Sequence, residues 1–67
     1  MNYASEKQRK FAKKLINLKA KKTFRKPRDV MDDFRIDYLD TMSKEKASHV
    51  IDVLIAEGYG PDKNWGR

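Results

Sequence analysis

Residues 43–58 read SKEKASHVIDVLIAEG, and this stretch decides the fold class. Its apolar residues recur at the i, i+3, i+4, i+7, i+8 spacing of an amphipathic helix, and they are Ala47, Val50, Ile51, Leu54 and Ile55. Ser43 stands where its hydroxyl can cap the first turn, and Gly58 supplies the left-handed residue at which helices commonly end. The stretch predicts a helix over about 44–57 with one face turned to a core.

A second helix is predicted over about 5–21. Ser5 and Gln8 have the spacing of a capping box, in which each side chain bonds the backbone N–H of the other residue. Phe11, Leu15 and Leu18 form the apolar stripe of this helix, with Ala4, Ala12 and Ile16 at its margins. Pro27 disfavours helical geometry at Lys26, so the helix has to end before it.

The middle segment predicts a helix over about 28–38, of which 28–34 is the firmest part. Pro27 suits the first position of a helix, and carboxylates follow in the first turns, where the helix dipole favours them. Phe34, Ile36 and Tyr38 also alternate with charged residues, as in a short strand. Residues 34–39 therefore stay open between helix and strand.

These elements predict an all-α fold, a small three-helix domain over 1–60 with a flexible tail over 61–67. The expected core consists of Phe11, Leu15, Leu18, Val30, Phe34, Leu39, Ala47, Val50, Ile51, Leu54 and Ile55, and Tyr38 is also expected to be buried. The chain has 67 residues and no cysteine, which excludes disulfides and thiolate zinc sites. Its apolar runs are too short for a membrane span, and the expected location is the cytoplasm.

Two phrases of the sequence resemble a known type of module. Ala4-Ser5-Glu6-Lys7-Gln8 opens one helix, and Leu39-Asp40-Thr41-Met42-Ser43-Lys44-Glu45-Lys46-Ala47-Ser48 leads into Val50, Ile51 and Leu54. Together they resemble a short helical module of unassigned function, (S/T)-E-K-Q … L-(T/S)-K-x-x-A-S-x-x-I-x-x-L, of phage, mobile-element and DNA-metabolism proteins. The resemblance covers about 5–18 and 39–55. It implies a helical, hairpin-like core and a DNA-associated setting, and it transfers no catalytic residue.

Charge is distributed unevenly along the chain. Residues 1–28 hold eleven bases and one acid, whereas residues 29–67 hold five bases and nine acids. Such a basic segment is typical of proteins that neutralise phosphates. The candidate polyanion-binding residues are Lys7, Lys10, Lys13, Lys14, Lys21, Lys22, Arg25, Lys26 and Arg28. The acidic middle of the chain offers the competing interpretation, in which it neutralises the basic segment internally.

Other chemistry has weak support in the sequence. Asp29, Asp32, Asp33, Asp37 and Asp40 lack the glycine-turned loop of a calcium site, so no metal is predicted. His49 falls on the polar face of its helix without a nucleophile beside it. We therefore expect no enzymatic activity and no cofactor.

The leading functional hypothesis is a small basic nucleic-acid-binding accessory protein, phage- or mobile-element-encoded, whose first helix contacts the phosphate backbone, with DNA weakly favoured over RNA. The alternative is a protein-binding inhibitor or adaptor that targets an acidic surface of a host nucleic-acid enzyme. In that alternative Tyr59 and Trp65 are the candidate anchors. The chain is expected to be a monomer, or a homodimer in which basic and acidic halves pair.

Overall fold

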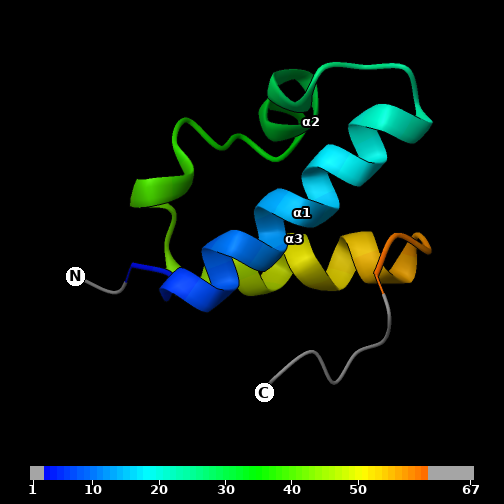
Figure 1. Ribbon diagram of the computed structural model, residues 1–67. Helices are drawn as coiled ribbons and strands as arrows, with labels where there is room; N and C mark the ends of the chain where they lie inside the picture. The colour runs from blue at the N-terminus through cyan, green and yellow to red at the C-terminus, as the bar shows by residue number, and fades with distance from the viewer. Residues whose placement is uncertain (1–2, 61–67) are drawn as a thin grey trace.

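The computed structural model describes residues 3–60, which form three α-helices and one 3-10 helix (Figure 1). They are α1 (Glu6–Lys22), α2 (Pro27–Asp33), η1 (Leu39–Thr41) and α3 (Lys44–Ala56). The all-α prediction is confirmed, and the predicted bounds of α1 and α3 agree to within one residue. Within residues 3–60 no helix is long and apolar enough to cross a membrane. The predicted tail, 61–67, lies outside the described residues.

Both long helices begin at the predicted serine caps. The Ser5 hydroxyl accepts the backbone N–H of Gln8 at 3.2 Å, and the Gln8 side chain accepts the N–H of Ser5 at 3.0 Å. At the start of α3, the Ser43 hydroxyl accepts the N–H of Lys46 at 3.0 Å. These bonds satisfy donors that the first turn of a helix leaves without a partner.

Helices α1 and α3 pack side by side and run in the same direction (Figure 1). Their starts are joined by a hydrogen bond from Ala4 N–H to the Met42 carbonyl at 2.8 Å, and their ends by the ion pair of Lys19 and Glu57 at 2.8 Å. The expected hairpin-like pairing is therefore wrong. The reason is that α2 and the segment after it carry the chain back to the start of α1 before α3 begins.

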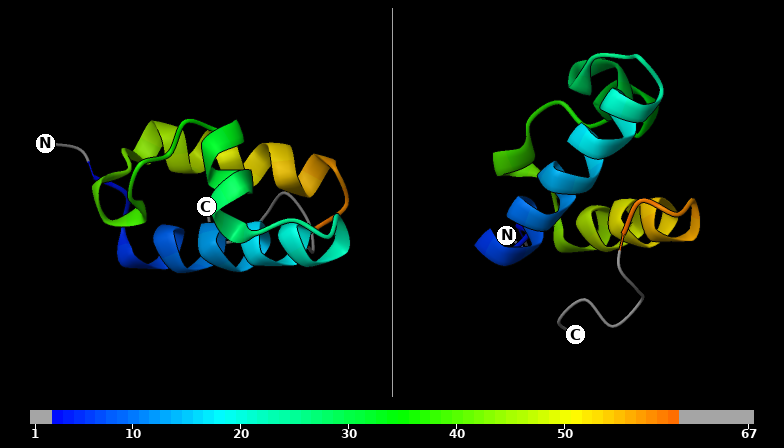
Figure 2. Two further views of the ribbon diagram at one scale, coloured as in Figure 1. Left: turned by 90° about the horizontal axis from the view of Figure 1, so that it is seen from above. Right: turned by 45° about the vertical axis from the view of Figure 1, so that its right-hand side comes forward.

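Helix α2 lies across α1 and is shorter than the predicted 28–38 (Figure 2). It ends at Asp33 because Arg35 takes a left-handed conformation, with φ of 58°, and turns the chain. Ile36 then returns to the core and is buried. Residues 34–38 are thus neither helix nor strand, and both interpretations of the alternating pattern are wrong.

The core lies where α1 meets α2 and α3. Its buried side chains are Ala4, Ala12, Leu15, Ile16, Ala20, Val30, Ile36, Met42, Ala47, Val50, Ile51, Leu54 and Ile55, while Phe11, Phe34 and Leu39 pack against it half-buried. Leu18 lies partly exposed outside this core, and Tyr38 is 71% exposed, so the burial predicted for both is wrong. Because α1 is covered on two sides, its buried face rotates toward the small residues Ala12 and Ala20, which allow close approach of the helices.

All three α-helices end in the same type of turn, the Schellman motif. The N–H beyond each left-handed residue donates to a carbonyl five residues earlier, from Arg25 to Ala20 at 2.8 Å, from Ile36 to Met31 at 2.9 Å and from Tyr59 to Leu54 at 3.0 Å. The left-handed residues themselves are Phe24, Arg35 and Gly58, with φ of 57°, 58° and 96°. The geometry is shared, but only α3 carries the glycine that this position favours.

Candidate nucleic-acid interface

Four lysines form one exposed line along α1, here called the lysine line: Lys7, Lys10, Lys14 and Lys21. At 100° per residue they fall within a sector of about 60°. Lys7, Lys14 and Lys21 follow one another at intervals of two turns, about 10 Å along the axis, and Lys10 lies between the first two. Lys13 borders this sector and is also exposed. The predicted lysine surface of the first helix is therefore a single continuous face.

Packing explains why this face stays open. The opposite face of α1 carries Ala12, Leu15, Ile16 and Ala20, all buried against α2 and α3. Once those two helices cover the apolar side, the lysine line has to point to solvent. The alternation of apolar and basic residues in α1 thus sets the position of the candidate interface.

Most of the ion pairs among residues 3–60 join carboxylates to cations away from the lysine line. They are Arg9–Asp40 at 3.2 Å, Lys19–Glu57 at 2.8 Å, Arg25–Asp33 at 2.6 Å and Arg28–Asp32 at 3.2 Å. Acidic residues after position 28 therefore do neutralise part of the basic segment. They do so at the sides of α1 and on α2, and they leave its exposed face basic.

On the lysine line itself, the carboxylate within ion-pair distance is Glu6, which lies 3.1 Å from Lys10 one turn away. Both side chains are more than two-thirds exposed, so the pair is weak and is screened by salt. Among residues 3–60, no carboxylate lies within 4.0 Å of Lys7, Lys14 or Lys21. Three of the four cations on the line are thus without an internal counter-charge in the described part of the chain.

The ion pair of Arg25 and Asp33 ties the turn after α1 to the end of α2. The hydrogen bond from the Arg25 guanidinium lowers the pKa of the Asp33 carboxyl, and the same bond raises the pKa of Arg25. The guanidinium also donates to the Asp29 carbonyl at 3.1 Å. Arg25 is therefore committed to holding α2, although it was a candidate for the polyanion site.

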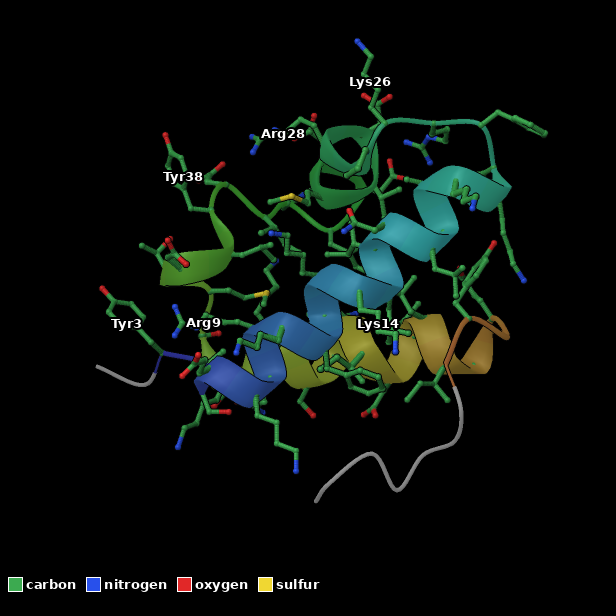
Figure 3. All side chains as sticks on the ribbon, in the orientation of Figure 1. Tyr3, Arg9, Lys14, Lys26, Arg28 and Tyr38 are labelled. Carbon is green, nitrogen blue, oxygen red and sulfur yellow. The ribbon has the colours of Figure 1, made fainter. Side chains whose placement is uncertain are left out.

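The nine candidate cations do not share one surface. Lys22 turns toward α3, where its ammonium lies 6.0 Å from the ring centroid of Tyr59. Lys26 precedes α2 and points away from the body of the molecule, and Arg28 lies on α2 (Figure 3). The lysine line with Lys13 forms one group. Lys26 and Arg28, with Arg25, form a separate one around α2.

The exposed aromatic residues differ from Tyr59 and Trp65, the two anchors predicted for the adaptor. Tyr59 packs half-buried against the core, and Trp65 lies outside the described residues. Phe24 is instead 98% exposed, and sequence reasoning missed it. The sequence feature that could have revealed it is an aromatic residue among lysines and arginines in the segment that ends the first helix. Tyr3 and Tyr38 are also exposed, at the end of the molecule where α1 begins (Figure 3).

The aspartates and His49 are the groups that the sequence offers for metal or catalytic chemistry. No group of three or more His, Asp or Glu side chains in this part of the chain is arranged to hold a metal ion. His49 is exposed and lies edge-on to the Phe34 ring, with the ring centroids 6.5 Å apart. Phe34 also has the Lys19 ammonium 5.9 Å from its centroid, so this cluster joins the three helices.

A surface hollow of about 300 Å³ borders the lysine line. Arg9, Lys10, Lys13, Glu6, Leu39 and Asp40 line it. The Nε atom of Arg9 is buried there without a hydrogen-bond partner among the described residues. Two carboxylates offset most of the positive charge, so the hollow favours anions much less than the open lysine line does.

Comparison of the chain with protein-family models, curated proteins and solved structures gives no match. The resemblance of residues 5–18 and 39–55 to the helical module therefore remains a prediction, and the function proposed below rests on the exposed lysines of α1.

Proposed function

We propose that this chain is a small nucleic-acid-binding accessory protein that contacts the phosphate backbone through the lysine line of α1. The observation that carries the proposal is the placement of the ion pairs. The acidic residues engage Arg9, Lys19, Arg25 and Arg28, whereas Lys7, Lys14 and Lys21 face solvent without a carboxylate within 4.0 Å in residues 3–60.

The proposed mode of binding is electrostatic and independent of base sequence. Lysines spaced along one helix face can contact several phosphates of a strand at once, and each neutralised phosphate releases condensed counterions. The lysine line consists of flexible point charges, which suit phosphates and give little means of reading base edges. Binding is therefore expected in the micromolar class, about 10⁻⁴ to 10⁻⁶ M at physiological salt.

Four phosphate contacts predict a definite salt dependence. The slope of log K against log salt is about −0.9 per contact on duplex DNA, or about −3.6 for the lysine line. Affinity should then fall about 100-fold between 50 and 200 mM salt. Fluorescence anisotropy with labelled duplex and single-stranded oligonucleotides across this range measures both quantities.

Charge reversal on and off the line tests the location. Lys7→Glu with Lys14→Glu should weaken binding and reduce the slope by about 1.8, because two phosphate contacts are lost. The matched control is Arg35→Glu with Lys44→Glu, which changes the net charge equally at exposed positions off α1. Equal losses in both variants would place the contact elsewhere, and absence of binding to any nucleic acid at low salt would refute the proposal.

The adaptor alternative makes a different prediction. An inhibitor that grips an acidic protein surface should be recovered with its partner after nuclease treatment, whereas an accessory protein held by nucleic acid should not. Of the two anchors predicted for the adaptor, Tyr59 already packs against the core, which leaves it less surface for a partner.

A further inference from the structure

Phe24 occupies a position that neither folding nor solubility explains. It is the left-handed residue of the turn after α1, with φ of 57°, where a side chain with a Cβ is disfavoured and glycine is preferred. Its side chain is 98% exposed and so contributes no packing to the core. Both the backbone conformation and the exposure of an aromatic ring act against the folded state.

The same molecule provides the comparison. The equivalent position at the end of α3 is Gly58, in a turn with the same hydrogen bond. Strain that persists at an exposed position is a reason to look for a function there. The third such residue, Arg35, is polar and suits an exposed turn, so Phe24 alone of the three combines strain with an exposed apolar ring.

The residues that flank Phe24 in the sequence are cationic, and they include the last member of the lysine line. Lys21, the last lysine of the line, lies three residues before it, and Lys26 lies two residues after it. Both are exposed, and within residues 3–60 neither side-chain ammonium has a carboxylate within 4.0 Å. The Asp29 carboxylate accepts the backbone N–H of Lys26 at 3.4 Å and leaves its ammonium unpaired in this part of the chain. An exposed ring that cations flank in the sequence is suited to holding an unpaired base, with the ring stacking on the base and the cations contacting its phosphates.

We propose that Phe24 is a stacking platform for an unpaired base, so that the protein prefers single-stranded nucleic acid, or an unpaired end, over a continuous duplex. This inference rests on the proposed function, because the lysine line has to hold the strand that brings the base to the ring. In a duplex the bases are paired and stacked on one another, and Phe24 then has no base face to contact.

A protein partner fits this ring less well. Protein interfaces bury a contiguous apolar centre in which several side chains cooperate. The large exposed apolar residues among 3–60 are Tyr3, Phe24 and Tyr38. Tyr3 and Tyr38 lie where α1 begins and Phe24 follows its end, which separates them by about 25 Å along a 17-residue helix. Phe24 is thus an isolated ring among cations.

The test compares two substitutions at this position on two nucleic acids with equal numbers of phosphates, an oligothymidine strand and a blunt-ended duplex of two complementary strands. Phe24→Gly removes the ring and the backbone strain, and Phe24→Leu removes the ring but keeps an apolar side chain in the same strained conformation. Both should weaken binding to the single strand about 5- to 150-fold and leave duplex binding and the salt slope unchanged. Phe24→Trp should retain single-strand binding.

The outcomes separate the two proposals. If the unmodified chain binds both nucleic acids and Phe24→Gly binds the single strand equally well, the stacking platform is refuted and the lysine line stands. Equal losses on strand and duplex also refute stacking. If the unmodified chain binds neither nucleic acid at low salt, the proposed function is refuted, and the stacking platform, which rests on it, is refuted as well. Phe24-dependent capture of a protein after nuclease treatment would then identify a protein partner instead.

Discussion

The ends of α1 and α3 are the same turn used in two different ways. At the end of α3, Gly58 takes the left-handed conformation, Tyr59 packs against the core, and Gly60 lies so close to Ile55 that a Cβ on it would meet the Ile55 Cγ1 atom at 2.4 Å. At the end of α1, Phe24 takes the left-handed conformation and its ring faces solvent.

The difference is that the turn after α3 stabilises the fold, whereas the turn after α1 exposes an aromatic ring to solvent. At the end of α3, the residue types agree with both the backbone conformation and the core, so this turn closes the fold. At the end of α1, the turn is held by its hydrogen bonds, including one from the Thr23 hydroxyl to the Lys19 carbonyl at 2.7 Å, against the preference of the residue at its centre. A residue kept in such a place is a candidate for binding rather than for folding.

The largest effect is expected at the end of α3. Gly60→Ala places a methyl group against the buried and stiff Ile55 side chain, and overpacking of this kind costs about 1–3 kcal/mol. Chemical denaturation followed by circular dichroism measures the loss. In an Ile55→Ala background the clashing atom is absent, so the cost of Gly60→Ala should largely disappear. A cost that persists there would contradict the close approach.

Exchanging residue types at the two left-handed positions should change stability in opposite directions. Gly58→Ala should destabilise the protein by about 1–2 kcal/mol, since its φ of 96° disfavours any Cβ although no atom lies within 4 Å. Phe24→Gly should stabilise it by about 0.5–1 kcal/mol. Glycine relieves the strain of the left-handed conformation, and part of this gain is lost because glycine has more conformational entropy in the unfolded chain. Arg35→Gly is the matched control, because Arg35 has nearly the same φ and its replacement should also stabilise the protein. Destabilisation by Phe24→Gly would show that the ring packs after all.

The smallest effect concerns the ion pair that follows Phe24. The Arg25 hydrogen bond lowers the pKa of Asp33 below its ordinary value of 3.8, so the pair's contribution is fully present above that value. It is lost as the pH falls below 3.8 and through the lowered pKa. Asp33→Asn should therefore differ from the unmodified chain at neutral pH, with the difference vanishing in strong acid. Urea midpoints of both proteins at neutral pH and in strong acid test this. A difference between the two proteins that stays the same at both pH values would argue against the ion pair.

Much of the fold was predictable because it follows from local rules. Ser5, Gln8 and Ser43 cap helices through side chains that bond backbone groups within three residues, and the Val50–Ile51–Leu54 stripe follows the helical period. The prediction failed where two distant elements decide the outcome. The burial of Ala12 and Ala20 in place of Leu18 depends on α2 and α3 covering α1 together, which the spacing within one helix does not reveal.

The candidate site was likewise predictable in part from the sequence and in part only from the tertiary structure. The sequence by itself determined that α1 carries a basic face, because its lysines and apolar residues alternate with the period of a helix. Only the tertiary structure decided which cations remain available, because ion pairs such as Arg9–Asp40 and Lys19–Glu57 join residues more than 30 positions apart. It also decided the exposure of Phe24, because neither α2 nor α3 covers the side chain of this residue.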